Sequence, residues 1–223
     1  NSYSILVHLG MTGKIILINS KKKKCPTSFY YSLKNNNTIH DHLIFEFNKN
    51  IKLVYNDVRK FGFIKIYKTK QLYLSPHLKK LGPEPLSKRF DFNYFKEKIR
   101  KRRIFLKDLL MDQKFLAGLG NIYVNEVIFL SKINPRLKVN NLTDKEIISL
   151  VSNIKKVLKK AVKEGGSSIK DFNNIKGKKG NFQQFFNVYA RQDEPCTRSN
   201  CIGTIRRIKI SNRSTFFCGK CQN

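Results

Sequence analysis

Apolar and polar residues alternate along much of the first 75 positions of the chain. The alternation is clearest in SILVHLGMTGKIILI (4–18), HLIFEFNKNIKLVYND (42–57) and FGFIKIYK (61–68), which are rich in Ile, Val, Phe and Tyr. This period of two predicts β-strands, and NKN at 48–50 predicts a hairpin turn. LGPEPL at 81–86 carries two prolines and a glycine and predicts a boundary after the β region.

From Asp91 onward, apolar residues recur every three or four positions, which indicates helices. One helix follows Asp91, and two more are expected in FLKDLLMDQKFL (105–116) and NIYVNEVIFL (121–130), joined through AGLG. In TDKEIISLVSNIKKVLKKAVKEGG (143–166), Thr143 and Glu146 have the spacing of a capping box, and Gly165 suits the helix end. The apolar residues of this segment share one face, and we interpret its Lys-rich face as solvated.

The residues after this long helix are rich in Gly, Asn and Lys and are too polar for a core element. We therefore expect a mobile loop near 166–181, followed by FQQFFNVYA and a cysteine-containing arm. The predicted fold class is α+β. Its parts are a β lobe over 1–86, a helical domain over 87–190 and the arm over 191–223.

The charge of the chain is strongly positive. Lys and Arg number 45 against 15 Asp and Glu, which gives a net charge of +30 and a pI near 10.1. Such an excess favours polyanionic partners, nucleic acid first. A solvated Lys-rich surface, of the kind that an AT-rich coding sequence produces, is the alternative. No apolar run approaches the ~20 residues of a membrane-spanning helix, so we expect no membrane partner.

Four of the five cysteines form two closely spaced pairs near the end of the chain, Cys196 with Cys201 and Cys218 with Cys221. Zinc takes four thiolates in a tetrahedron, and short paired spacings place two ligands on each of two turns. The intervening residues suit a β-hairpin that bends near SNR (211–213) and is too small to fold without the metal. Two disulfides or uncoordinated thiols are the alternative, but the spacing favours one structural zinc ion.

Arg213 lies at the predicted tip of this hairpin, where its guanidinium group can bind a backbone phosphate. An ordinary solvated arginine is the alternative, and the absence of acids from residues 196–221 favours phosphate. A second candidate is LLMDQKFLAGLGNIYVNEVIF (109–129), in which Gly118 and Gly120 precede Asn121 at a predicted helix start. Glycines allow close approach of a phosphate, and a helix start presents unpaired N–H groups. A plain helix–helix turn would look similar.

These features occur together with further motifs in one order along the whole chain. The chain resembles formamidopyrimidine-DNA glycosylase, a bacterial base-excision enzyme for oxidised purines, and its endonuclease VIII relatives. The resemblance implies two lobes: a truncated N-terminal β-sandwich, and a helix-two-turns-helix domain that ends in a zinc β-hairpin. The matching stretches are HLGMTGK (8–14), HDHL (40–43), NDVRKFGF (56–63), LGPEPL (81–86), MDQKFLAGLGNIYVNEVIF (111–129), GKKGNFQQFFNVYAR (177–191), EPC (194–196), GTI (203–205) and NRSTFFCGKCQ (212–222).

The resemblance also assigns roles to single residues. Met11, Arg59 and Phe61 match residues that fill the space left by an extruded nucleotide, although Met11 and Phe61 would otherwise be interpreted as core. Arg213 matches an arginine that assists the second elimination of the lyase reaction. The loop near 166–181 favours the formamidopyrimidine branch over endonuclease VIII. The matched DNA-binding positions are His40, Arg59, Arg102, Met11, Phe61, Lys107 and Asn121, and the matched metal ligands are Cys196, Cys201, Cys218 and Cys221.

The chain departs from the family pattern at its start. The family nucleophile is an N-terminal proline followed by an acidic residue, and NSYSILVHLG contains neither; a family lysine near the end of that opening segment is also absent. We therefore expect a truncated DNA glycosylase and AP lyase that binds DNA without excising a base. The alternatives are a non-catalytic damaged-DNA-binding descendant, an endonuclease VIII-type enzyme and an RNA-binding zinc-ribbon protein.

The expected partner is duplex DNA that contains oxidised purines, bound by a monomer. The expected location is the bacterial cytoplasm, at the nucleoid, or an organelle of bacterial origin. Both expectations come from the resemblance.

Overall fold

The structure is a computed structural model that describes residues 2–21, 24–26, 37–167 and 181–222. The chain divides into two compact units, one formed by 1–79 with 167–183 and the other by 80–166 with 184–223. Most of the predicted mobile loop near 166–181 lies outside the described residues. Within the described part of the chain, no helix is both long and apolar enough to cross a membrane.

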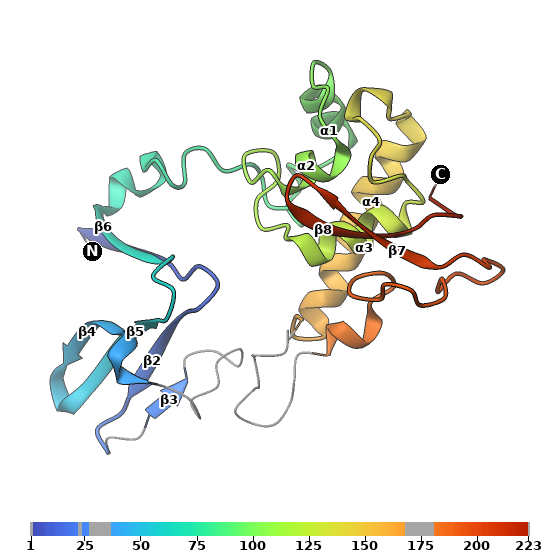
Figure 1. Cartoon of the computed structure of the whole chain (residues 1–223). Helices are drawn as coiled ribbons and strands as arrows, with labels where there is room; N and C mark the ends of the chain where they lie inside the picture. The colour runs from blue at the N-terminus through green and yellow to red at the C-terminus, as the bar shows by residue number, and fades with distance from the viewer. Residues whose placement is uncertain (1, 22–23, 27–36, 168–180, 223) are drawn as a thin grey trace. The chain divides into compact units, whose positions relative to one another are not determined.

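The first unit is built of antiparallel strands, as the alternating pattern predicts (Figure 1). β1 (Tyr3–His8) pairs with β6 (Phe63–Lys68). A four-stranded sheet has the order β3-β2-β5-β4, with β3 (Lys24–Pro26), β2 (Gly13–Ile18), β5 (Ile51–Asp57) and β4 (Asp41–Phe47). Short 3-10 turns are η1 (Thr38–His40), η2 (Asn48–Asn50) and η3 (Thr69–Leu74).

The predicted turn at NKN joins β4 to β5. Lys49 and Asn50 both have positive φ, at 62° and 57°, which matches the twist of a tight antiparallel hairpin. The buried apolar residues of this unit lie on the central strands and include Ile16, Val54 and Tyr55.

The second unit contains four α-helices in its described residues. They are α1 (Phe92–Ile99), α2 (Leu106–Met111), α3 (Asn121–Leu130) and α4 (Asp144–Lys163), and the 3-10 turn η4 (Val139–Asn141) precedes α4. Another 3-10 turn, η5, spans Phe182–Phe185. The chain ends in the antiparallel hairpin of β7 (Ile205–Ile210) and β8 (Arg213–Cys218), which contacts α3.

The helix ends follow local chemistry. Asp91 caps α1 by accepting a hydrogen bond from the amide of Tyr94 at 2.8 Å. The predicted capping box is present: Thr143 Oγ1 accepts from the amide of Glu146, whose carboxylate accepts from the amide of Thr143 at 2.8 Å. Gly165 follows α4 with φ of 72°, as its role at the helix end requires.

The helix predicted over 105–116 is wrong in length, because α2 ends at Met111. Asp112 leaves the helical conformation and its Oδ1 accepts a hydrogen bond from the amide of Lys114 at 2.9 Å, which starts a turn. The apolar residues Phe115, Leu116 and Leu119 are nevertheless buried. The apolar spacing therefore reports burial correctly, although the backbone that carries it is not helical.

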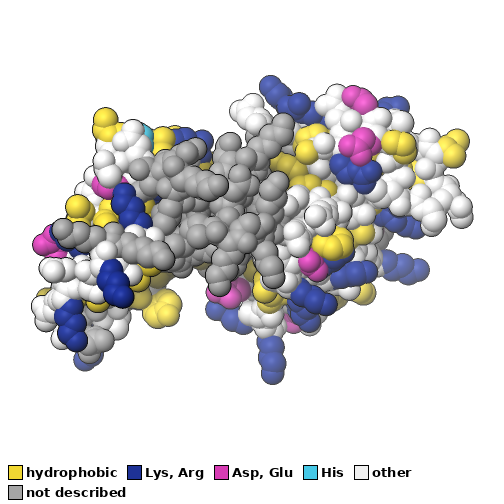
Figure 2. All heavy atoms as spheres, turned by 90° about the horizontal axis from the view of Figure 1, so that it is seen from below, with side chains coloured by type: hydrophobic (Ala, Val, Ile, Leu, Met, Phe, Trp, Pro, Cys, Tyr) yellow, Lys and Arg dark blue, Asp and Glu magenta, His cyan; other side chains and the backbone are white. Residues whose placement is uncertain are grey.

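The positive charge is dispersed on the face seen in Figure 2. Lys and Arg side chains project from several places on each unit, with a few acids among them. The candidate site is therefore defined by contacts rather than by charge density.

Candidate nucleic-acid interface and metal centre

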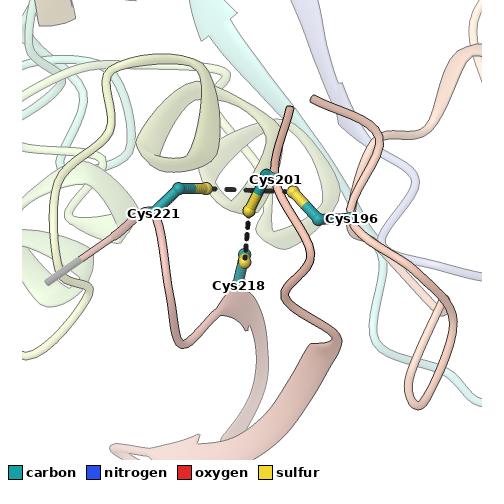
Figure 3. Close-up of side chains that lie close together, drawn as sticks. All are labelled: Cys196, Cys201, Cys218 and Cys221. Carbon is teal, nitrogen blue, oxygen red and sulfur yellow. Dashed lines mark hydrogen bonds between the residues drawn. The ribbon is translucent and has the colours of Figure 1, made fainter. Parts of the chain in front are cut away.

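The four paired cysteines meet in the second unit, as their spacing predicts (Figure 3). Their sulfur atoms all lie within 4.8 Å of one another. The Sγ atoms of Cys196 and Cys221 are 3.8 Å apart, and those of Cys201 and Cys218 are 3.7 Å apart. Each close contact joins a cysteine of the first pair to one of the second, so the cluster fastens the segment before β7 to the end of β8.

These distances fit metal ligation better than disulfide bonding. A disulfide needs a sulfur–sulfur distance of about 2.05 Å. Four sulfurs at ~2.3 Å from a central ion have tetrahedral edges of about 3.8 Å. The surroundings are equally close: a Cβ atom added to Gly203 would lie 2.6 Å from the sulfur of Cys218. The four thiols can therefore hold one metal ion, and glycine at position 203 leaves the space that the sulfur of Cys218 needs.

The hairpin that begins and ends at this cluster bends where the sequence predicts. Ile210 pairs with Arg213, and Ser211 and Asn212 between them both have positive φ, 46° and 62°. Ser211 Oγ donates a hydrogen bond of 2.8 Å to Asp108 of α2. Arg213 is exposed directly after the turn. The tip is thus fixed to α2 while its arginine remains open to solvent.

Lys107 and Asn121 reach the same hairpin from α2 and α3. Lys107 Nζ donates to the carbonyl oxygen of Ser214 at 2.7 Å and to the hydroxyl of Thr215 at 2.6 Å. Asn121 Nδ2 donates to the same Ser214 oxygen at 3.2 Å. The structure therefore brings together Lys107, Asn121 and Arg213, three of the residues singled out in the sequence.

Lys107 is almost fully buried, with 1% of its surface exposed. Burial first, and then the nearby charge of Arg213, lower the pKa of its ammonium group to about 8, although the charge of Asp108 opposes the shift. A cationic group so close to Arg213 raises the positive potential at the hairpin tip.

The start of α3 is open, as the glycine spacing suggests. Gly120 is its N-cap and supplies no side-chain hydrogen bond to the first turn. Gly118 has φ of 84°, and a Cβ atom added at Gly118 or Gly120 would meet nothing within 4 Å. The backbone at the start of α3 therefore leaves room for an anion to approach the first turn.

In the first unit, Met11, Arg59 and Phe61 project into solvent. Met11 is 69% exposed and Phe61 is 67% exposed, so neither belongs to the core. The guanidinium carbon of Arg59 lies 5.2 Å from the centre of the Phe61 ring. Two loops carry these residues, and the amide of Arg59 donates to the hydroxyl of Thr12 at 3.2 Å, which joins the loops.

A buried carboxylate, Asp57, organises both loops. It accepts hydrogen bonds from the hydroxyl of Thr12, the hydroxyl of Tyr55 at 3.0 Å, and the amides of Arg59 and Gly62 at 3.3 Å and 2.9 Å. Burial opposes ionisation, but these donors outweigh it and lower the pKa of Asp57 to about 2. Asp57 was not among the residues singled out from the sequence, although an acid that ends an apolar strand beside a glycine-containing loop is a usable signal.

Among the described residues, no contact joins His40 or Arg102 to the hairpin-tip group around Arg213 or to the exposed group around Phe61. His40 is the half-buried last residue of η1 in the first unit. Arg102, in the second unit, is half-buried, with its Nη1 3.4 Å from a carboxylate oxygen of Asp112. Their DNA-binding roles stay predictions.

Two further residues missed from the sequence join α3 to later segments of the chain, one to residues 187–189 and one to β8. Glu126 is buried and accepts from the amides of Asn187, Val188 and Tyr189 at 2.8–3.0 Å. Asn125 Oδ1 accepts from the amide of Phe216 at 2.7 Å. The signal was available, because Glu126 is the only charged residue in NIYVNEVIFL.

Comparison with known proteins agrees with this geometry. Residues 1–64 match the formamidopyrimidine-DNA glycosylase N-terminal domain, and residues 81–173 match the formamidopyrimidine-DNA glycosylase H2TH domain. The formamidopyrimidine-DNA glycosylase of Rhodopseudomonas palustris is 39% identical over 224 residues, which cover 98% of this chain and 76% of that protein. That of Rickettsia felis is 42% identical over 223 residues, covering 100% and 75%.

Solved structures give the same result. A Lactococcus lactis FPG mutant in complex with Fapy-dG containing DNA has a TM-score of 0.83 at 37% identity and covers 100% of this chain and 76% of that chain. MutM in complex with carbocyclic 8-oxo-G containing DNA has a TM-score of 0.82 at 38% identity, covering 100% and 75%. By fold, motif order and identity over nearly its whole length, the chain belongs to the formamidopyrimidine-DNA glycosylase family of DNA glycosylases.

Proposed function

We propose that this protein binds duplex DNA at an oxidised purine or an abasic site. The observation that carries the proposal is the position of Arg213, exposed on a hairpin whose base is the cysteine cluster and whose tip is hydrogen-bonded to Lys107 and Asn121. A guanidinium group held in this way suits a backbone phosphate. The relatives crystallised with Fapy-dG or 8-oxo-G DNA support the lesion class.

The exposed side chains of the first unit fit the extrusion of a nucleotide. An enzyme that acts on a base removes it from the stack, which costs a few kcal/mol. Apolar side chains that enter the vacated space offset part of that cost. Met11 and Phe61 are exposed apolar groups on loops held by Asp57, and Arg59 lies against Phe61. We assign this filling role to these three residues.

The thiolate cluster is proposed to hold one zinc ion, with Cys196, Cys201, Cys218 and Cys221 as ligands. When bound, zinc supplies structural cross-linking, because four protein ligands leave no position for substrate. The chemistry of this chain's own residues is therefore binding and orientation. Arg213 is the candidate to assist elimination, since its charge can stabilise a departing phosphate.

Excision itself needs a nucleophile. In the family, by resemblance, this is an N-terminal proline beside an acid, and these residues are not found at the start of the 223-residue sequence. We propose that excision in the family proceeds through the covalent imine formed by this proline, and that the residues described above recognise the lesion. The protein is proposed to act as a monomer on DNA in a bacterial cytoplasm or an organelle of bacterial origin.

Binding and excision are tested separately. Fluorescence anisotropy with 8-oxoguanine, abasic-analogue and undamaged duplexes, and with duplex RNA, should show preference for the damaged DNA. Borohydride trapping on the same duplexes measures covalent chemistry independently of affinity. Equal affinity for all four ligands would overturn the binding proposal.

A further inference from the structure

Arg198 lies in the spacer between Cys196 and Cys201 and reaches out of the cysteine cluster to α3. Its Nη2 donates hydrogen bonds to the carbonyl oxygen of Phe129 and, at 3.3 Å, to that of Leu130. These are the last two residues of α3. A guanidinium group satisfies carbonyls at a helix C-terminus and complements the negative end of the helix dipole. The spacer is therefore bonded to the end of α3.

The same side chain also packs on the core around the cysteines. The guanidinium carbon of Arg198 lies 4.5 Å from the centre of the Phe129 ring, which is 1% exposed. Phe129 belongs to the buried cluster that contains Cys196 and Cys218. The ring of Phe129 thus contacts the arginine on one face and the core around the cysteines. Movement of residues 196–201, the first knuckle of the cluster, therefore changes the environment of the end of α3.

This contact has a cost that indicates a purpose. Arg198 Nε is buried and has no hydrogen-bond partner among the described residues. A buried unsatisfied donor destabilises the folded state, and more so when the group is charged. Leucine or methionine would fill the same space without that cost. The arginine is therefore better explained by what its two carbonyl contacts hold in place than by packing.

The opposite end of α3 approaches the hairpin tip. Asn121, the first residue of α3, donates to the carbonyl of Ser214, and Asn125, one turn later, binds the amide of Phe216. A ten-residue helix spans about 15 Å. Consequently the arm is hydrogen-bonded to α3 at its start, in its middle and at its end, and Arg198 makes the contact at the end.

We propose that Arg198 is a positioning residue that couples metal occupancy of the cysteine cluster to the placement of the hairpin tip. The proposal rests on the proposed zinc centre and DNA binding. With the metal bound, residues 196–201 hold Arg198 on the end of α3. The start of α3 in turn holds the carbonyl of Ser214, the residue after Arg213. Without Arg198, the metal is less well retained and the tip is less well placed, although no phosphate contact is lost.

The test uses the full chain with zinc bound, as Arg198→Gln and Arg198→Lys variants. The matched control is Lys220→Gln, which removes one exposed charge from the other knuckle. Zinc release to a chromophoric chelator is measured at a temperature well below the midpoint of thermal unfolding. Affinity for an abasic-analogue duplex is measured across a series of salt concentrations.

For Arg198→Gln we expect zinc release about five- to tenfold faster and duplex affinity about fivefold weaker, consistent with the loss of a charge-assisted contact. The salt slope should equal that of the wild type, because the proposed role of Arg198 is to hold helix carbonyls and not to bind phosphate. Arg198→Lys should change zinc release and duplex affinity less than Arg198→Gln does, since lysine keeps the charge.

Wild-type zinc release and affinity in Arg198→Gln would overturn the proposal, and so would a salt slope lowered by about one, which marks a direct phosphate contact. If Arg198→Gln does not fold, Arg198→Lys and a Phe129→Leu variant, which removes the stacking partner, give the same readouts. Failure of the wild type to bind zinc or duplex would instead overturn the proposed function.

Discussion

The side-chain nitrogen of Lys107 lies 2.7 Å from the carbonyl oxygen of Ser214, a residue 107 positions further along the chain. This contact joins the first turn of α2 to the residue after Arg213. A lysine with 1% exposure is rare unless it is paired, and here the partners are a carbonyl and a hydroxyl, neither of which carries charge. The placement of Arg213 therefore depends on a buried cation that is itself only partly compensated.

Substitution of Lys107 by Met should remove a pH-dependent part of the stability. The folded pKa, about 8, is below the ordinary 10.5. Between these values the unfolded chain binds a proton that the folded chain has released, so the lysine's contribution to the free energy of unfolding rises with pH. Urea unfolding should show the difference between wild type and Lys107→Met growing by at most about 3 kcal/mol from pH 8 to 10.5.

The control for this experiment is Lys114→Met, which removes an exposed lysine close by in the sequence. It should leave the pH dependence unchanged. Parallel stability curves for wild type and Lys107→Met would show that Lys107 is not buried as a cation.

Arg213→Ala should weaken duplex binding to every sequence to a similar extent. If the guanidinium contacts one phosphate, the slope of log affinity against log salt should fall by about 0.9. Zinc content should stay unchanged, since Arg213 lies at the tip of the hairpin and the cysteines lie at its base. Anisotropy titrations over a salt series measure the slope, with Lys145→Ala on α4 as the control. A change in base preference at constant slope would contradict the phosphate assignment.

Much of the fold was predictable because its signals are local. The capping box of Thr143 and Glu146, the turn at NKN and the bend at Ser211 and Asn212 each depend on residues within a few positions of one another. The cysteine cluster was predictable for a related reason, since paired spacings and a hairpin length specify a tetrahedron without knowledge of the surroundings.

The contacts that build the site were not predictable from local patterns. Glu126 accepts from amides more than 60 residues away, and Asp57 binds Thr12 across 45 positions. No sequence period encodes such partners. The end of α2 at Met111 was missed for another reason: Phe115 and Leu116 continue the apolar spacing while Asp112 turns the backbone. The exposure of Met11 and Phe61 followed from the resemblance and not from hydrophobicity.

Asp57→Asn should loosen the loops that carry Met11, Arg59 and Phe61. The folded pKa of Asp57 is lowered to about 2, so its contribution to stability is complete above its ordinary value of 3.8 and is lost as pH falls from about 4 to 2. At neutral pH the variant should be less stable by about 2 kcal/mol. Amide hydrogen exchange at Arg59 and Gly62 should accelerate.

Acid unfolding supplies the check on this prediction. The difference in stability between wild type and Asp57→Asn should shrink between pH 4 and 2. Glu46→Gln, which removes an exposed acid paired with Lys52 on the same sheet, should show no such window. Unchanged exchange at Arg59 in Asp57→Asn would mean that the carboxylate does not hold the loop.

Removal of the metal should release the link between the segment before β7 and the end of β8. Chelation of the wild type should lower duplex affinity at least about tenfold, because the phosphate-binding tip then lacks a fixed geometry. Added zinc should restore both affinity and near-native circular dichroism. Cys25→Ser should respond like the wild type, because Cys25 lies on β3 and is not one of the four clustered cysteines. Full duplex affinity after complete zinc loss would disprove the structural role of the metal.

Ala190→Gly should stabilise the protein, in contrast to most alanine-to-glycine changes. Ala190 follows the amides bound by Glu126 and has φ of 60°, a left-handed conformation that costs a non-glycine residue about 1–2 kcal/mol. Glycine removes this strain but gains unfolded-state entropy worth roughly 0.4–1 kcal/mol, so the net gain should be about 0.5 kcal/mol. Ala161→Gly, within α4, should instead destabilise by about 1 kcal/mol or more. Equal losses in both variants, measured by urea unfolding, would place Ala190 in a right-handed turn and show that the backbone there is not strained.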